Sequence, residues 1–189
     1  TLKNYIALNP NSPYAPALQN KVLHTMQLGK FFSQSFAEKE VFITNYDLNS
    51  NYYTTADEET KAYIRPYLYA YLDEVARFYH ARAQQAKASG LASAEMNTNY
   101  QTALTYYQKF IESFPGDINV PEKIYMMAEI NADINDYQQA IVLYERAAYD
   151  NPIHFYSEDA AIASIVAYGK LVSAEQDPEK HKELVDKKL

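Results

Sequence analysis

The sequence predicts an all-α protein, built as an alpha-alpha superhelix in which antiparallel helix pairs stack on one another. Only four of the 189 residues are glycine, which argues against a β architecture rich in glycine turns. A similar segment recurs along the chain and ends in a helix-stopping residue at positions 10, 47, 115 and 152, so two units span 37 residues and one spans 68. Because one helix pair cannot bury its own apolar face, such repeats are expected to stack into a solenoid with a concave surface.

The last three repeats share one register of core residues, which predicts the face that each helix buries. Counted back from Phe42, Phe110 and Ala147, equivalent residues lie three, six, seven and ten positions earlier, on one face of a helix. The residue seven positions back is small in every repeat, so it is predicted to mark the closest helix–helix approach. The equivalent sets are Phe32, Tyr100 and Tyr137; Ser35, Ala103 and Ala140; Phe36, Leu104 and Ile141; and Lys39, Tyr107 and Tyr144.

Eight helices are predicted in chain order, near residues 14–28, 30–46, 57–88, 98–114, 121–134, 137–150, 157–173 and 178–188. Pro16 and Pro121 suit the first turn of the helices at 14–28 and 121–134, where a missing N–H costs nothing. The helices at 30–46, 98–114 and 137–150 carry the shared register and stop before Asp or Pro. The helix at 157–173 contains the most apolar stretch, and the one at 178–188 is rich in Lys and Glu.

The helix predicted at 57–88 falls within a long insertion at about 48–97. An apolar stripe of helical period runs along it from Ile64 to Tyr79. Pro66 is expected to kink or split this helix near Arg65, because proline removes a helical hydrogen bond. The flanking segments 48–56 and 89–97 are rich in Asn, Tyr, Thr and Ser and are predicted to be loops.

One repeat carries a family resemblance. The segment 135–152 resembles the second helix of a tetratricopeptide repeat (TPR) through Asp136, Tyr137, Ala140, Ile141, Tyr144, Ala147 and Pro152. The segment 99–115 also resembles it, with Phe110 where the family prefers Ala, and 30–47 does so loosely. The 37-residue unit and the Phe-Ile-x-x-aromatic-Pro ending are similar to bacterial envelope-type TPR proteins, such as the outer-membrane assembly lipoprotein and the Tol–Pal coordinator.

The composition argues against several classes of function. The formal net charge is −7, which disfavours nucleic acid or an anionic membrane surface as the main partner. The absence of Cys excludes thiol catalysis and cysteine-ligated metals. The four histidines are scattered, and the segment from Asp133 to Tyr137 mimics a calcium loop but lacks its glycine. No catalytic constellation emerges, so we expect neither an enzyme nor a cofactor or metal site.

The TPR resemblance implies where a partner would bind, because the first helix of each pair lines the groove in that family. The implied face comprises Asn20, His24 and Gln27 on 14–28 and Tyr125, Glu129 and Ala132 on 121–134. Tyr125 and Glu129 depart from the family's carboxylate clamp, so we expect a neutral, aromatic or basic segment of a partner protein or peptide.

Two alternatives to a protein-binding scaffold stay open. One is an enzyme or ligand-binding protein with a site in the 48–97 insertion, where Tyr52, Tyr53 and Tyr69 are the next candidates for a surface contact. The other is a purely structural part of a longer repeat array. We expect one domain over residues 1–189, excised from a longer protein, with no transmembrane segment. The resemblance favours a periplasmic or outer-membrane-associated place over the cytoplasm, with a lipid anchor before Thr1 as a further option.

Overall fold

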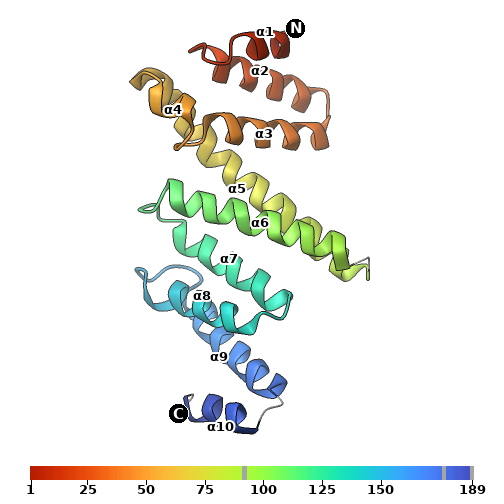
Figure 1. The fold of residues 1–189 in the computed structure, drawn as a ribbon, viewed down its shortest axis with the longest axis vertical. Coiled ribbons are helices and arrows are strands. Elements are labelled where there is room, and N and C mark those ends of the chain that lie inside the picture. The colour runs from red at the N-terminus through yellow and green to blue at the C-terminus, as the bar shows by residue number, and fades with distance from the viewer. Residues whose placement is uncertain (91–92, 176–177, 188–189) are drawn as a thin grey trace. The chain divides into compact units, whose positions relative to one another are not determined.

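The computed structural model describes residues 1–90, 93–175 and 178–187. It is 80% helical, and these described residues form no strand, which confirms the all-α prediction (Figure 1). The helices are α1 (Leu2–Leu8), α2 (Ala15–Leu28), α3 (Phe32–Tyr46), α4 (Asn51–Thr55), α5 (Glu58–Ala88), α6 (Ser93–Ser113), α7 (Val120–Asp133), α8 (Tyr137–Tyr149), α9 (Ser157–Ala174) and α10 (Pro178–Lys187). None of the helices among these residues is long and apolar enough to cross a bilayer.

The predicted loops at 48–56 and 89–97 are partly wrong. Helix α4 occupies most of the first segment, and α6 begins at Ser93 in the second. Ser50 explains α4, since its hydroxyl accepts a hydrogen bond from the Tyr53 N–H at 3.1 Å and so caps the first turn. Thr1 caps α1, which was not predicted, in the same way through the Asn4 N–H. The end of the last predicted helix, at 188, lies outside the described residues.

The predicted break at Pro66 does not occur, because α5 runs without interruption from Glu58 to Ala88. Pro66 lacks the N–H that would bond to the carbonyl of Ala62. Both residues are exposed, so water can satisfy that carbonyl. The apolar stripe of α5 is confirmed at Ile64, Leu68 and Leu72, which are fully buried.

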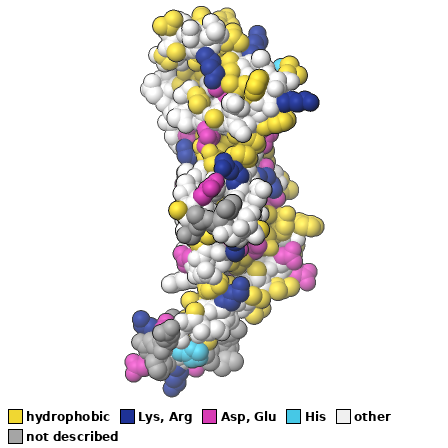
Figure 2. All heavy atoms as spheres, turned by 90° about the vertical axis from the view of Figure 1, so that its right-hand side faces the viewer, with side chains coloured by type: hydrophobic (Ala, Val, Ile, Leu, Met, Phe, Trp, Pro, Cys, Tyr) yellow, Lys and Arg dark blue, Asp and Glu magenta, His cyan; other side chains and the backbone are white. Residues whose placement is uncertain are grey.

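The chain divides into two compact units, Thr1–Phe78 and Tyr79–Leu189, with the boundary inside α5. The single domain expected over residues 1–189 stays a prediction. On the face that Figure 2 shows, hydrophobic side chains are interspersed with charged ones.

In the first unit, α2 packs on α3 and both contact α5. Phe42 is fully buried, and its ring lies edge-on to those of Tyr46 and Tyr71, with centroids 4.8 and 5.2 Å apart. Ser35, predicted to mark close helix approach, is 2% exposed. The register fails at Phe32, which is 62% exposed, because Phe32 is the first residue of α3 and has no preceding turn to bring its ring against a neighbour.

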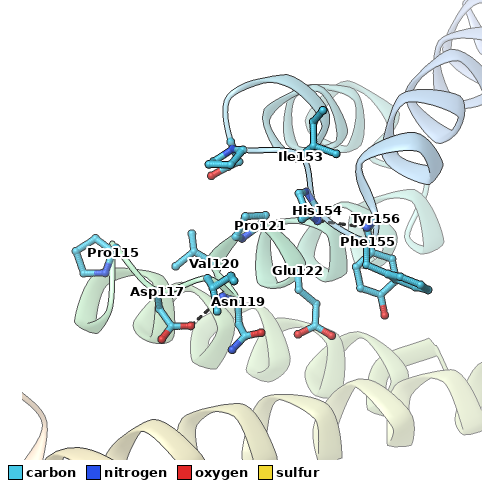
Figure 3. Close-up of a pocket in the computed structure, with 14 residues that line it drawn as sticks. Pro115, Asp117, Asn119, Val120, Pro121, Glu122, Ile153, His154, Phe155 and Tyr156 are labelled. Carbon is cyan, nitrogen blue, oxygen red and sulfur yellow. Dashed lines mark hydrogen bonds between the residues drawn. The ribbon is translucent and has the colours of Figure 1, made fainter.

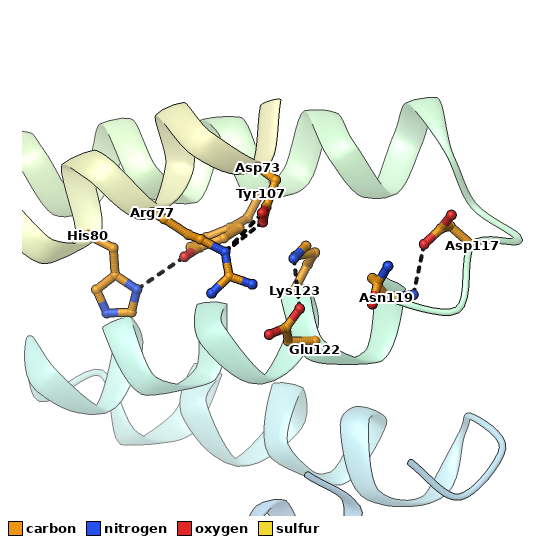
Figure 4. A network of polar contacts seen from close by, with 8 residues as sticks. All are labelled: Asp73, Arg77, His80, Tyr107, Asp117, Asn119, Glu122 and Lys123. Atoms are coloured by element: carbon orange, nitrogen blue, oxygen red, sulfur yellow. Dashed lines mark hydrogen bonds and ion pairs between the residues drawn. The ribbon is translucent and has the colours of Figure 1, made fainter. Parts of the chain in front are cut away.

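In the second unit, α6, α7, α8 and α9 pack in succession, each on the next (Figure 1). The predicted core residues Ala103, Phe110, Ala140 and Ala147 are fully buried there. A buried polar contact joins α5 to α6, where the His80 Nδ1 lies 3.3 Å from the Tyr107 hydroxyl (Figure 4). The repeat register therefore describes the interior of this unit well.

Candidate binding groove

A groove of about 460 Å³ opens in the second unit between α7 and α9, with α8 behind it. Residues on one face of α7 and one face of α9 supply its two walls, at the spacing of successive helical turns. The α7 wall consists of Tyr125, Glu129, Ala132 and Asp133, and the α9 wall of Asp159, Ile162, Ala163, Val166, Ala167 and Lys170. The structure thus brings together the three residues of 121–134 that were predicted to face a groove.

Tyr125 forms an aromatic stack at one end of this groove. Its ring lies nearly parallel to that of Tyr156, with centroids 4.8 Å apart and 12° between the planes, and 5.8 Å from the ring of Tyr144. Burial, followed by the negative charges of Glu129 and Asp159, raises the pKa of Tyr125 to about 12. The phenol therefore stays neutral at physiological pH and can donate a hydrogen bond.

A residue of α8, Tyr144, contacts Glu129. The Tyr144 hydroxyl donates a hydrogen bond to the Glu129 carboxylate. Burial raises the pKa of Tyr144, and the bond to Glu129 raises it further. Because Tyr144 is neutral, this contact orients the carboxylate without cancelling its charge.

The opposite end of the groove is organised around Asp133. Its carboxylate accepts hydrogen bonds from Lys87 Nζ on α5 and from the Tyr100 hydroxyl on α6, each at 2.6 Å. Lys170 on α9 lies over the ring of Tyr137, 5.4 Å from its centroid. This end therefore carries a neutralised acid and a second cation, whereas the Tyr125 end carries carboxylates.

The other predicted binding residues lie on α2 in the first unit. Asn20 is half-buried, donating to the Tyr63 hydroxyl at 3.1 Å and accepting from the Tyr71 hydroxyl at 2.9 Å. These contacts tie α2 to α5, so the side chain has a structural role. His24 and Gln27 are exposed. Their part in a binding face stays a prediction.

The tyrosines singled out in the insertion are less exposed than expected. Tyr52, Tyr53 and Tyr69 are all half-buried, and the first two lie in α4 rather than in a loop. The Tyr52 hydroxyl donates to the carbonyl of Ser12 at 2.7 Å, and its ring packs on Tyr46. These contacts explain why α4 forms at all in so polar a segment.

Two aspartates, one of them in the segment 133–137 that mimics a calcium loop, have local structural roles. Asp57 accepts the Thr60 N–H at 2.7 Å and Asp136 accepts the Gln139 N–H at 3.1 Å, so both cap helices. Hydrogen bonding to the Thr60 backbone lowers the pKa of Asp57. In the described part of the chain, no three His, Asp or Glu side chains gather to hold a metal ion.

A second, larger pocket of about 740 Å³ lies between the connectors that precede α7 and α9 (Figure 3). Ile118, Ile153 and Phe155 at its rim are 85%, 95% and 85% exposed. No prediction from the sequence included this pocket. The signal was available, because these large apolar residues fall in connectors, where the helical register assigns them no packing partner.

Comparisons with protein families, with curated proteins and with solved structures find no match to this chain. The TPR resemblance therefore stays a prediction from the residues quoted above.

Proposed function

We propose that this protein is a non-catalytic scaffold that binds an extended segment of a partner protein or peptide in the groove between α7 and α9. The supporting observation is the convergence of the two helix faces on one open groove. Aliphatic side chains remain accessible on its α9 wall, where Ile162 is 55% exposed and Val166 53% exposed. Accessible apolar residues beside ordered polar groups are typical of sites that take up a partner.

The arrangement of helices supports the finer part of this proposal, a TPR-like superhelix. Helix α8, the second helix of the α7–α8 pair, carries the residues of the resemblance, and its Ala140 and Ala147 are buried. The first helix of that pair and the helix that follows it, α9, both face the groove. This is the arrangement expected when the first helices of successive pairs line a concave surface.

A binding role agrees with the chemistry of the groove better than catalysis does. Asp133 is engaged by Lys87 and Tyr100, and Glu129 by the hydroxyl of Tyr144. Tyrosines with raised pKa values hold a proton too tightly to exchange it near neutral pH. The ordered polar groups can therefore position a partner.

The test uses two matched substitutions, Val166→Arg in the groove and Val142→Arg on α8 outside it. Val166 and Val142 are 53% and 54% exposed, so the arginine introduced in each variant has a similar exposure to solvent. Wild-type protein is immobilised and screened with a phage-displayed library of random peptides, and enriched peptides are synthesised for fluorescence anisotropy.

We expect Val166→Arg to weaken peptide binding by about tenfold or more and Val142→Arg to leave it within about twofold, since an arginine at 166 blocks the groove and one at 142 does not. Equal losses in the two variants, or a library that yields no enriched peptide, would contradict the proposal. Far-ultraviolet circular dichroism of both variants controls for folding.

A further inference from the structure

We propose that the Tyr125 end of the groove receives a basic side chain, lysine or arginine, of the bound peptide. This inference rests on the proposed function and assigns a chemical preference to one end of the same groove. It follows from the distribution of charge and of aromatic surface between the two ends.

The charge of the groove is uneven along its length. Glu129 and Asp159 line it next to Tyr125, and within the described part of the chain neither carboxylate forms an ion pair. At the other end, Lys87 neutralises Asp133 and Lys170 adds a positive charge. Asp159 and Lys170 are 11 positions apart on α9, which separates them by roughly 16 Å along the helix axis. A cation is therefore attracted to one end and repelled from the other.

The aromatic surface at the same end suits a cation as well. The face of a tyrosine ring attracts ammonium and guanidinium groups. Tyr125 borders the groove together with Tyr144, and Tyr156 holds the Tyr125 ring in place from outside the groove. A planar guanidinium could lie along these rings while its N–H groups reach the two carboxylates.

The partly enclosed setting strengthens this preference. Glu129 is half-buried, so its charge is less screened by water than that of a fully exposed acid. The Tyr144 hydroxyl occupies one carboxylate oxygen, Oε1. Because this hydroxyl is neutral, the negative charge of Glu129 remains, and an anionic guest would meet two uncompensated carboxylates, Glu129 and Asp159.

The experiment uses the enriched library peptides and removes charge from either side. In the peptide, arginine is replaced by citrulline or lysine by Nε-acetyl-lysine, which keeps the shape and removes the charge. In the protein, Glu129→Gln is combined with Asp159→Asn; glutamine keeps an oxygen for the Tyr144 hydroxyl. Glu158→Gln is the matched control, since Glu158 is on the same turn of α9 as Asp159 but does not line the groove.

We expect enriched peptides to share a lysine or arginine, and its neutralisation to weaken binding by about tenfold or more. The Glu129→Gln/Asp159→Asn protein should bind about equally weakly and should no longer distinguish arginine from citrulline. The Glu158→Gln protein should retain both the affinity and the discrimination.

Three outcomes would overturn the inference. Enriched peptides without a basic residue, still blocked by Val166→Arg, would leave the proposed function standing and remove the charge preference. Enrichment of acidic peptides would place an anion near Lys170 instead. The third outcome is that the library enriches no peptide and that the protein forms a concentration-dependent dimer, which Val166→Arg abolishes. This outcome would assign the groove to a second copy of this chain and remove both proposals.

Discussion

The two units share the helical register except at its first position, and they place different chemistry in it. The residue three positions before the register's end is Lys39 in the first unit and Tyr107 and Tyr144 in the second. All three are at most 5% exposed, and each directs a polar tip to another helix. Lys39 reaches Glu74 on α5, while Tyr107 reaches His80 on α5 and Tyr144 reaches Glu129 on α7.

The comparison shows that this position requires a long apolar stem with a polar end. Lysine meets this requirement because its methylene chain can pack while its ammonium finds a partner. The Lys39 ammonium also lies 4.6 Å from the ring centroid of Phe36. Lys39 departs from the aromatic residues of the other repeats, but at this position it is therefore the chemical equivalent of tyrosine.

The largest expected difference between the units concerns the first register position, Tyr100 against Phe32. Tyr100 is fully buried and bonded to Asp133, so Tyr100→Ala should lower the free energy of unfolding by about 3–5 kcal/mol. Phe32 is 62% exposed, so Phe32→Ala should change it by no more than about 0.5 kcal/mol. Urea denaturation followed by circular dichroism measures both. Similar losses would mean that Phe32 is buried and that the register holds in the first unit after all.

The next effect concerns close packing within the second unit. Ala140 is fully buried between helices, and Ala140→Leu should cost about 1–3 kcal/mol through overpacking. Ala132 is half-buried on the groove wall, so Ala132→Leu should be nearly neutral. Melting temperatures of the two variants provide the measurement, and equal decreases would show that the assignment of inner and outer faces is wrong.

The smallest effect is a pH dependence present in both units. Burial, with a smaller contribution from the negative charge of Asp57, raises the pKa of Tyr52 to about 12. Burial, with smaller contributions from the charges of Glu129 and Asp159, raises the pKa of Tyr125 to about 12. The folded state favours the neutral phenols, so their contribution to stability is complete below the ordinary tyrosine pKa of about 10 and is lost as the pH rises toward 12.

Tyr52→Phe and Tyr125→Phe should each reduce the loss of stability between these two pH values. Spectrophotometric titration of tyrosinate should also show one fewer late-ionising group in each variant. Wild-type tyrosines that all ionise together near pH 10 would contradict this expectation.

The long helices could be predicted closely because periodicity and stop signals agree. The predicted 137–150 compares with α8 at Tyr137–Tyr149, and 57–88 with α5 at Glu58–Ala88. Helices α1 and α4 could not be predicted, because a helix this short depends on a cap and on tertiary contacts such as Tyr52 with Ser12. The continuity of α5 through Pro66 agrees with the exposure of Ala62 and Pro66, which no local sequence pattern records.

The groove could be predicted only in part. Tyr125, Glu129 and Ala132 share a face at spacings of four and three, and the TPR resemblance implied that this face lines a groove. The α9 wall could not be predicted, because the segment around Val166 is apolar on all sides. Its sequence therefore does not indicate which helix face borders the groove. The structural role of Asn20 could not be predicted, because its two hydrogen-bond partners, Tyr63 and Tyr71, lie 43 and 51 positions away in the sequence.

The stack of Tyr125 on Tyr156 has an optical consequence. The chain contains 19 tyrosines and no tryptophan, so its near-ultraviolet circular dichroism arises mainly from phenol rings. The rings of Tyr125 and Tyr156 are nearly parallel with centroids 4.8 Å apart, which is close enough for their electronic transitions to couple. A guest that touches Tyr125 would disturb this coupling, so occupancy of that end of the groove can be followed in the unlabelled protein.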